Sequence, residues 1–146
     1  MEPSSSRRPA QAGITVSVVD PSWYRLVRNP EAVARRAAAM AGGAANVLLA
    51  DNATVRRLNA RHRGRDKPTN VLTFEPGDII LASGIVAAEA KREGKRAGHH
   101  LAHLVIHGML HLQGFDHDRA GDARAMEMRE TRLLARLGVP NPWRAR

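Results

Sequence analysis

The sequence predicts an α+β fold in which a small mixed sheet of about four strands packs with about five helices. Short apolar or alternating runs, typical of strands, are interspersed with longer segments whose apolar residues recur at helical spacing. Gly and Pro separate these segments. Their order is strand, helix, strand, helix, two strands, three helices, which is typical of an α+β domain.

The first half of this domain alternates strands with helices. Residues 14–18 alternate apolar with polar side chains, as in a half-buried strand. Asn29 and Pro30 supply an N-cap and a first-turn proline, and Gly42 follows as a stop signal. The expected elements are a strand at 14–18, a helix from this cap to about Met40, a strand at 46–50 and a helix from Asp51 or Asn52 to about Ala60.

The second half contains two strands followed by three helices. A Glu-Pro-Gly turn at 75–77 joins the two strands and is suited to antiparallel pairing. Ser83 is expected to cap the next helix, and Gly114 to end the one after it. The expected elements are strands at 71–74 and 78–81 and helices at 83 to about 93, 99–113 and about 121–137, with a basic loop at 63–68.

Length and composition limit the class of protein. The 146 residues, 43% of them hydrophobic, suit one domain over residues 14–146, preceded by a flexible tail at 1–13 that is rich in Ser, Arg and Pro. The absence of Cys excludes disulfides and thiolate metal ligands. No apolar run reaches the ~18 residues of a membrane span, and residues 1–13 do not resemble a signal peptide. We therefore expect a cytoplasmic protein with no membrane association.

The formal charge of +9 arises from 23 Lys and Arg against 14 Asp and Glu. Six basic residues lie between positions 56 and 67, opposed only by Asp66, and this cluster could contact phosphates. A solvated basic face is an equally good interpretation of the cluster. Two Trp, one Tyr and two Phe are too few for a base-stacking platform, so any bound nucleic acid should be recognised through its backbone.

Six of the seven His lie between positions 99 and 117. His107 and His111 are four residues apart and therefore share one face of a helix. Gly114 allows the chain to reverse, so that His117 can reach the same ion. Three His with an open fourth position are typical of a catalytic zinc site, and we expect one Zn²⁺ per chain.

The spacing H-x-x-x-H-x-x-G-x-x-H of residues 107–117 is also that of the metzincin peptidases. Those enzymes carry a Glu general base directly after the first His. Here that position is Gly108, which disfavours peptide hydrolysis by their mechanism. Zinc alone lowers the pKa of a bound water to ~7, so hydrolysis of another substrate remains possible.

The segment from His107 to His117 resembles the H-G-x-L-H-L-x-G-[YF]-D-H signature of the YbeY family, bacterial ribosomal-RNA maturation factors. The Leu-Asn pair at 58–59, the stretch from Asp66 to Phe74, and Gly-Asp-Ile at 77–79 resemble further motifs of that family. The resemblance implies a metal-dependent, single-strand-specific endoribonuclease that acts in 16S rRNA 3′ end maturation and in small-subunit ribosome biogenesis and quality control.

Carried over residue by residue, the resemblance assigns metal binding to His107, His111 and His117, and a functional role to Arg63. The guanidinium of Arg63 could grip the scissile phosphate and oppose charge that develops in the transition state. The implied partners are single-stranded or ribosomal RNA, the small ribosomal subunit and its assembly factors. The oligomeric state and the general base are not implied.

Neighbouring residues differ from the family or have supporting roles. His62 stands where the family commonly has Tyr, Thr73 stands where it has Ser, and the loop before Gly77 is shorter. We expect His103 to form a pocket wall or to act outside the ligand shell, and Asp116 either to accept a hydrogen bond from a ligand His or to organise a turn.

Two alternatives stay open beside the RNA hydrolase. One is a zinc-dependent, peptidase-like hydrolase, which the His spacing favours and Gly108 opposes. The other is a non-catalytic RNA-binding factor for ribosome assembly, in which a structural metal stabilises the fold.

Overall fold

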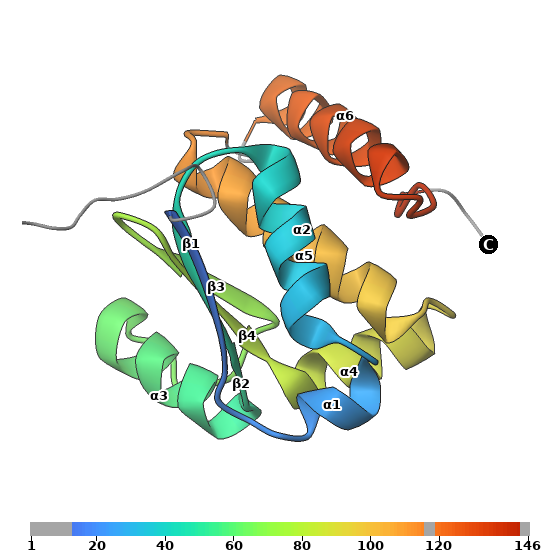
Figure 1. The fold of residues 1–146 in the computed structure, drawn as a ribbon. Helices are drawn as coiled ribbons and strands as arrows, with labels where there is room; N and C mark the ends of the chain where they lie inside the picture. Colours follow the sequence, from blue (N-terminus) through green and yellow to red (C-terminus); the bar gives the residue numbers. More distant parts are fainter. Residues whose placement is uncertain (1–12, 116–118, 144–146) are drawn as a thin grey trace, which may run out of the picture.

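The structure is a computed structural model that describes residues 13–115 and 119–143. The tail expected at 1–13 lies outside these ranges except for Gly13. A single sheet runs through the centre of the described chain, with helices on both of its faces (Figure 1). Within the described residues, no helix has the length and apolar character needed to cross a membrane.

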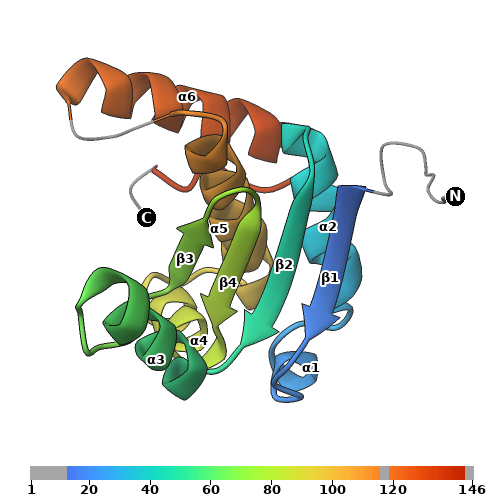
Figure 2. The ribbon, with the colours of Figure 1, turned by 90° about the vertical axis from the view of Figure 1, so that its left-hand side faces the viewer.

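The sheet has four strands in the order β1-β2-β4-β3, as Figure 2 shows. Parallel pairing joins β1 to β2 and β2 to β4, whereas β3 pairs with β4 in the antiparallel sense. The prediction of a small mixed sheet is therefore confirmed. The strands are β1 (Ile14–Val18), β2 (Ala45–Ala50), β3 (Val71–Phe74) and β4 (Asp78–Ala82).

The described residues form the five expected helices and one additional short helix. That additional helix, α1, has only four residues, too few to show helical spacing in the sequence. Its Trp23 is completely buried and donates from Nε1 to the carbonyl oxygen of Ala50 at 2.8 Å. The helices are α1 (Trp23–Leu26), α2 (Pro30–Ala41), α3 (Asn52–Arg63), α4 (Ser83–Arg92), α5 (Ala97–Leu112) and α6 (Ala120–Arg136).

Helix boundaries follow local capping at most ends. The side chain of Asn29 accepts from the backbone N–H of residue 32, and that of Asp51 accepts from the N–H of residue 54, as expected for N-caps. Ser83 is not a cap, which corrects the prediction: it is the first residue of α4, and its hydroxyl donates to the carboxylate of Asp20 at 2.5 Å. Helix α3 extends to Arg63, three residues beyond the expected end, and stops at Gly64 with φ +69°.

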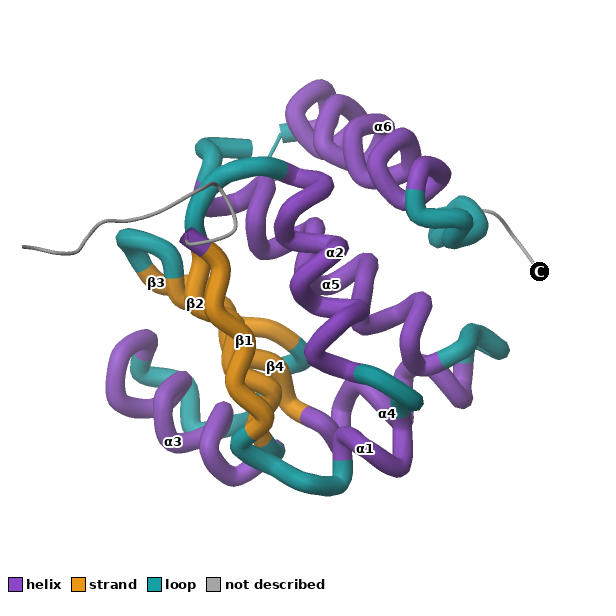
Figure 3. The backbone as a smooth tube through the Cα atoms, viewed as in Figure 1, coloured by secondary structure: helices purple, strands orange, loops and turns teal. Residues whose placement is uncertain are grey.

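The elements form layers around the sheet. Figures 1 and 3 show α3 on one face and α2 and α5 on the other, with α6 stacked outside α2 and α5, on the side away from the sheet. Successive side chains of β4 point to opposite faces of the sheet. Ile79 and Leu81 belong to the larger apolar core under α2 and α5, and Ile80 belongs to the smaller core under α3.

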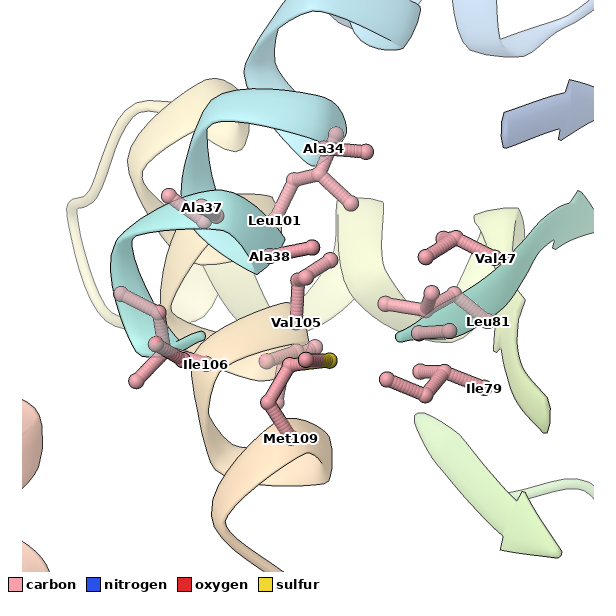
Figure 4. Packing of buried hydrophobic residues seen from close by; sticks show 14 of the residues in the cluster. Ala34, Ala37, Ala38, Val47, Ile79, Leu81, Leu101, Val105, Ile106 and Met109 are labelled. Carbon is pink, nitrogen blue, oxygen red and sulfur yellow. The ribbon is translucent and has the colours of Figure 1, made fainter. Parts of the chain in front are cut away.

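The larger core depends on small residues in α2. Ala34, Ala37 and Ala38 of that helix are fully buried and lie beside Leu101 and Val105 of α5 (Figure 4). Short side chains allow the two helices to approach closely while α5 still contacts the sheet. The position of α5 is thus set by packing on both sides, and α5 carries five of the seven histidines.

Candidate metal and RNA site

The side of α5 that meets the sheet contains Gly108. A Cβ atom added there would lie 3.1 Å from Cγ2 of Ile79 and 3.1 Å from Cγ2 of Thr73. Real Cβ atoms rarely approach neighbours this closely, so a larger residue at position 108 would require the side chains of Ile79 and Thr73 to give way by a few tenths of an ångström. The position at which metzincins carry their Glu is therefore filled by the sheet in this protein.

His107 and His111 line a groove of about 990 Å³ between α5, β3 and the end of α3. Their ring centroids are 4.7 Å apart. Two imidazoles at this separation on one helix face suit two adjacent ligand positions of a tetrahedral zinc ion, so the described residues fit the expected metal in part. The groove is also lined by Asn59, His62, Arg63, Arg65, Lys67, Pro68, Thr69, Asn70, Val71, Leu72 and Thr73.

Arg63 lies at the last position of α3 and reaches the edge of the sheet. Its Nη2 donates to the backbone oxygen of Thr73 at 2.6 Å, and its Cζ lies 5.2 Å from the centre of the Phe74 ring. The N–H of Ala82 donates to Asn70 O at 3.1 Å, so by the alternation of antiparallel pairing the carbonyl of Thr73 points away from β4. These contacts hold the guanidinium of Arg63 on the wall of the groove.

The turn after α5 begins as the sequence predicts. Helix α5 ends at Leu112, Gly114 adopts φ +98°, and the N–H of Phe115 donates back to Leu110 O at 3.0 Å. His117 and Asp116 lie outside the described residues, so their assigned roles stay predictions. Among residues 13–115 and 119–143, no three His, Asp or Glu side chains form a group that could hold a metal.

Glu130 of α6 lies behind the histidines and is fully buried. One carboxylate oxygen is 3.0 Å from Nε2 of His103, and the other is 2.5 Å from Nδ1 of His107. Burial alone would raise the pKa of Glu130, but the hydrogen bonds from His103 and His107 outweigh it and lower this pKa to about 2. Glu130 is therefore an ionised carboxylate at neutral pH.

Comparison with known proteins identifies the family. The family described as Endoribonuclease YbeY matches residues 22–138. The chain belongs to this family. A protein named endoribonuclease YbeY from Gluconobacter oxydans is 44% identical over 160 residues, which cover 99% of this chain and 93% of that protein. Another with this name, from Alkalilimnicola ehrlichii, is 46% identical over 142 residues, covering 83% and 86% of the two chains.

Among solved structures, this YbeY-family chain is similar to the solution structure of TM1509 from Thermotoga maritima. The TM-score is 0.59 and the sequence identity 27%, over 83% of this chain and 86% of that one. The resemblance stated from the sequence motifs is thus confirmed at the level of the family and the fold.

The sequence analysis did not identify Glu130, which contacts His107 of the candidate site. It lies four residues after Met126 and three and four residues before Leu133 and Leu134, all of them buried. An acidic residue on the apolar stripe of α6 was the available signal, because a buried carboxylate requires partners. His103 contacts this carboxylate and does not line the groove.

Proposed function

We propose that this chain is a zinc-dependent, single-strand-specific endoribonuclease that acts in the cytoplasm in ribosomal-RNA processing, including 16S rRNA 3′ end maturation. The observation that carries the proposal is that one groove is lined both by His107 and His111 and by Arg63. Family membership supports the same activity, because the relatives are named endoribonucleases. Ribosomal RNA, the small subunit and its assembly factors are the proposed partners.

In this proposal His107, His111 and His117 hold one zinc ion. Bound zinc supplies Lewis acidity and, from water, a nucleophile at neutral pH. Arg63 binds the scissile phosphate: a guanidinium has five N–H donors, and among the described contacts of Arg63 only one is used, on Thr73 O. Arg65 and Lys67, both exposed on the same groove, bind neighbouring phosphates and orient the strand.

The groove favours a phosphodiester over a peptide as the substrate. Its lining combines Arg63, Arg65 and Lys67 with three histidines, a cationic surface that attracts a polyanion. The peptidase alternative lacks a base at position 108, and a side chain there would press against Ile79 and Thr73.

The deciding experiment pairs metal analysis with RNA cleavage. Purified full-length protein should contain about one zinc per chain and should cleave a labelled single-stranded RNA but neither the matching duplex nor casein. Removal of the metal with a chelator should abolish cleavage, and added Zn²⁺ should restore it. His111→Ala should lose both metal and cleavage.

His99→Ala is the matched control, since His99 is on the same helix but does not line the groove. It should keep metal and activity. If the wild type cleaves no RNA with metal bound, and chelation only lowers its melting temperature, the protein is the non-catalytic assembly factor instead. Casein turnover that depends on the metal would establish the peptidase.

A further inference from the structure

The buried carboxylate of Glu130 joins two histidines that lie one helical turn apart on α5. It is 0% exposed, and its two oxygens are 3.0 Å from His103 Nε2 and 2.5 Å from His107 Nδ1. His107 also lines the groove, so this contact connects α6 with the candidate metal site. The sequence motifs of the site do not include Glu130.

The hydrogen bonds of Glu130 indicate which ring nitrogen carries hydrogen in His103 and in His107. Each oxygen of Glu130 lies within hydrogen-bond distance of one ring nitrogen, and carboxylate oxygens accept, so the contacts are satisfied when both of these nitrogens carry hydrogen. His107 is then protonated on Nδ1, and in the neutral ring its lone pair lies on Nε2. A histidine ligates a metal through the nitrogen that bears the lone pair, and its other N–H commonly donates to a carboxylate.

His103 fixes the carboxylate in turn. Its Nε2 faces Glu130, and its buried Nδ1 has no hydrogen-bond partner among the described residues. This arrangement suits the tautomer with hydrogen on Nε2, because an N–H on the buried Nδ1 would be an unsatisfied donor. Because His103 holds one oxygen of the Glu130 carboxylate, the other oxygen is directed at Nδ1 of His107.

We propose that Glu130 is a positioning residue that holds His107 in the Nδ1–H tautomer and in the ring orientation required to ligate the metal through Nε2. The inference rests on the proposed function for its metal, but the tautomer is a property of the metal-free protein. His103 is a second positioning residue, which acts on His107 only through its contact with Glu130.

Glu130→Gln tests the proposal, because it keeps the size of the side chain but changes its hydrogen bonding. A Gln amide accepts at its oxygen and donates at its nitrogen, so it cannot accept from both His103 and His107. Whenever the amide nitrogen faces His107, that ring must carry its lone pair on Nδ1 and its hydrogen on Nε2. We expect the zinc dissociation constant, measured by chelator competition, to rise ~10- to 100-fold.

The matched control is Glu89→Gln. Glu89 also contacts a buried histidine of α5, with its carboxylate 2.8 Å from His100 Nε2, and neither residue lines the groove. Glu89 belongs to α4 and Glu130 to α6, so this variant removes the same charge from a contact with the same helix, α5. Its zinc dissociation constant should stay within threefold of the wild type, even if its melting temperature falls as much as that of Glu130→Gln.

The second measurement is the tautomer of His107 in metal-free, ¹⁵N-labelled protein, read from long-range ¹H–¹⁵N NMR couplings. The wild type should show hydrogen on Nδ1, and Glu130→Gln should shift the ring toward Nε2–H. If Glu130→Gln does not fold, Glu130→Asp replaces it: its side chain is one methylene shorter, so its contacts with the two rings should lengthen, and zinc binding should weaken in the same direction.

Wild-type His107 with hydrogen on Nε2, or a folded Glu130→Gln protein that binds zinc within threefold of the wild type, would overturn the proposal. The two levels of inference can fail separately. RNA cleavage with no effect of Glu130 on zinc binding would remove the positioning role alone. Zinc binding that depends on Glu130 without any RNA cleavage would remove the proposed function alone.

Discussion

Gly108 is a position where the structure limits both packing and chemistry. Ile79 and Thr73 would each lie 3.1 Å from an added Cβ, so a side chain there must push these two residues of the sheet aside. Because Gly108 directly follows His107, any such displacement would also move the groove. The sequence showed that the peptidase base is missing at this position, but only the packing explains why glycine occupies it.

Gly108→Val should therefore destabilise the protein by ~2 to 3 kcal/mol, the cost of overpacking a well-filled core. Urea unfolding followed by circular dichroism measures this change. The same substitution at Gly121, a helical glycine whose added Cβ meets nothing within 4 Å, should change the free energy of unfolding by less than ~0.5 kcal/mol. Equal losses at the two positions would show that the contacts of Gly108 are not the cause.

Arg63→Ala tests the phosphate-binding role at the scale of one side chain. Loss of a charge-stabilising donor should lower kcat for RNA cleavage ~100- to 1000-fold and leave zinc content unchanged. Single-turnover cleavage and elemental analysis measure the two quantities. Arg132→Ala, which removes an exposed arginine of α6 far from the groove in sequence and absent from its lining, should cleave at the wild-type rate. Retained activity in Arg63→Ala would exclude Arg63 from the mechanism.

The spacing of candidate ligands along one helix can be predicted from sequence, whereas their tertiary partners cannot. His107 and His111 share a face because four residues span about one turn, and this follows from helix geometry alone. Glu130 reaches His107 only because α6 packs across α5, 23 residues later in the chain. Packing of α3 against the sheet likewise brings Arg63 to the sheet edge, so its contact with Thr73 O was not predictable.

At the scale of elements, a carboxylate links the end of β1 to the start of α4. Asp20 accepts from the backbone N–H of Ser22 at 3.0 Å, from the Ser22 hydroxyl at 2.6 Å and from the Ser83 hydroxyl at 2.5 Å. The side-chain hydrogen bonds of Ser22 and Ser83 are the largest causes that lower the pKa of Asp20 from 3.8. Segments 63 residues apart in sequence are thus joined through one ionised group.

This contact should make stability depend on pH. Because folding lowers the pKa of Asp20, its carboxylate stabilises the folded protein above pH 3.8, and this contribution is lost as the pH falls through the lowered pKa. Asp20→Asn should cost ~1 to 2 kcal/mol at pH 6, where charged hydrogen bonds are lost, and less at pH 3. Urea unfolding at both values measures the difference.

Ser83→Ala gives the cross-check for that pH dependence. It removes one donor to Asp20, so it should weaken the same pH-dependent component, and its effect should be much smaller in the Asp20→Asn background. A loss of stability that is equal at pH 6 and pH 3 in both single variants would contradict the role of the ionised carboxylate.

Local signals predicted most elements, and tertiary contacts decided the exceptions. Asn29 and Asp51 cap their own helices through hydrogen bonds to residues three positions later, which the sequence shows directly. Ser83 has the residue type of a cap but is held by Asp20, and α1 forms around Trp23, which the core buries. Neither effect is visible within a local stretch of sequence.

At the scale of the whole molecule, the proposed function predicts that the part of the +9 charge that lines the groove determines RNA binding. Arg63, Arg65 and Lys67 all line it. Three phosphate contacts on a single strand predict a slope of about −2 for log Ka against log salt concentration, from ~0.7 per contact. Fluorescence anisotropy with a labelled single-stranded RNA, between 50 and 300 mM salt as rough limits, measures this slope.

The double variant Arg65→Ala/Lys67→Ala should reduce the magnitude of that slope by ~1.4. Arg129→Ala/Arg132→Ala removes the same charge from exposed positions of α6 that do not line the groove, and it should leave the slope unchanged. Equal effects of the two double variants would mean that RNA binds through the overall charge and not through this groove.

The contact between Arg63 and the backbone of Thr73 has a consequence for self-association. β3 is an edge strand, and the Thr73 carbonyl points outward, where a strand from another molecule could pair with it. The guanidinium occupies that acceptor and places a positive charge beside it. Edge-to-edge addition of a second copy is therefore opposed by the same side chain that we assign to phosphate binding, and a protein lacking it should have a greater tendency to aggregate.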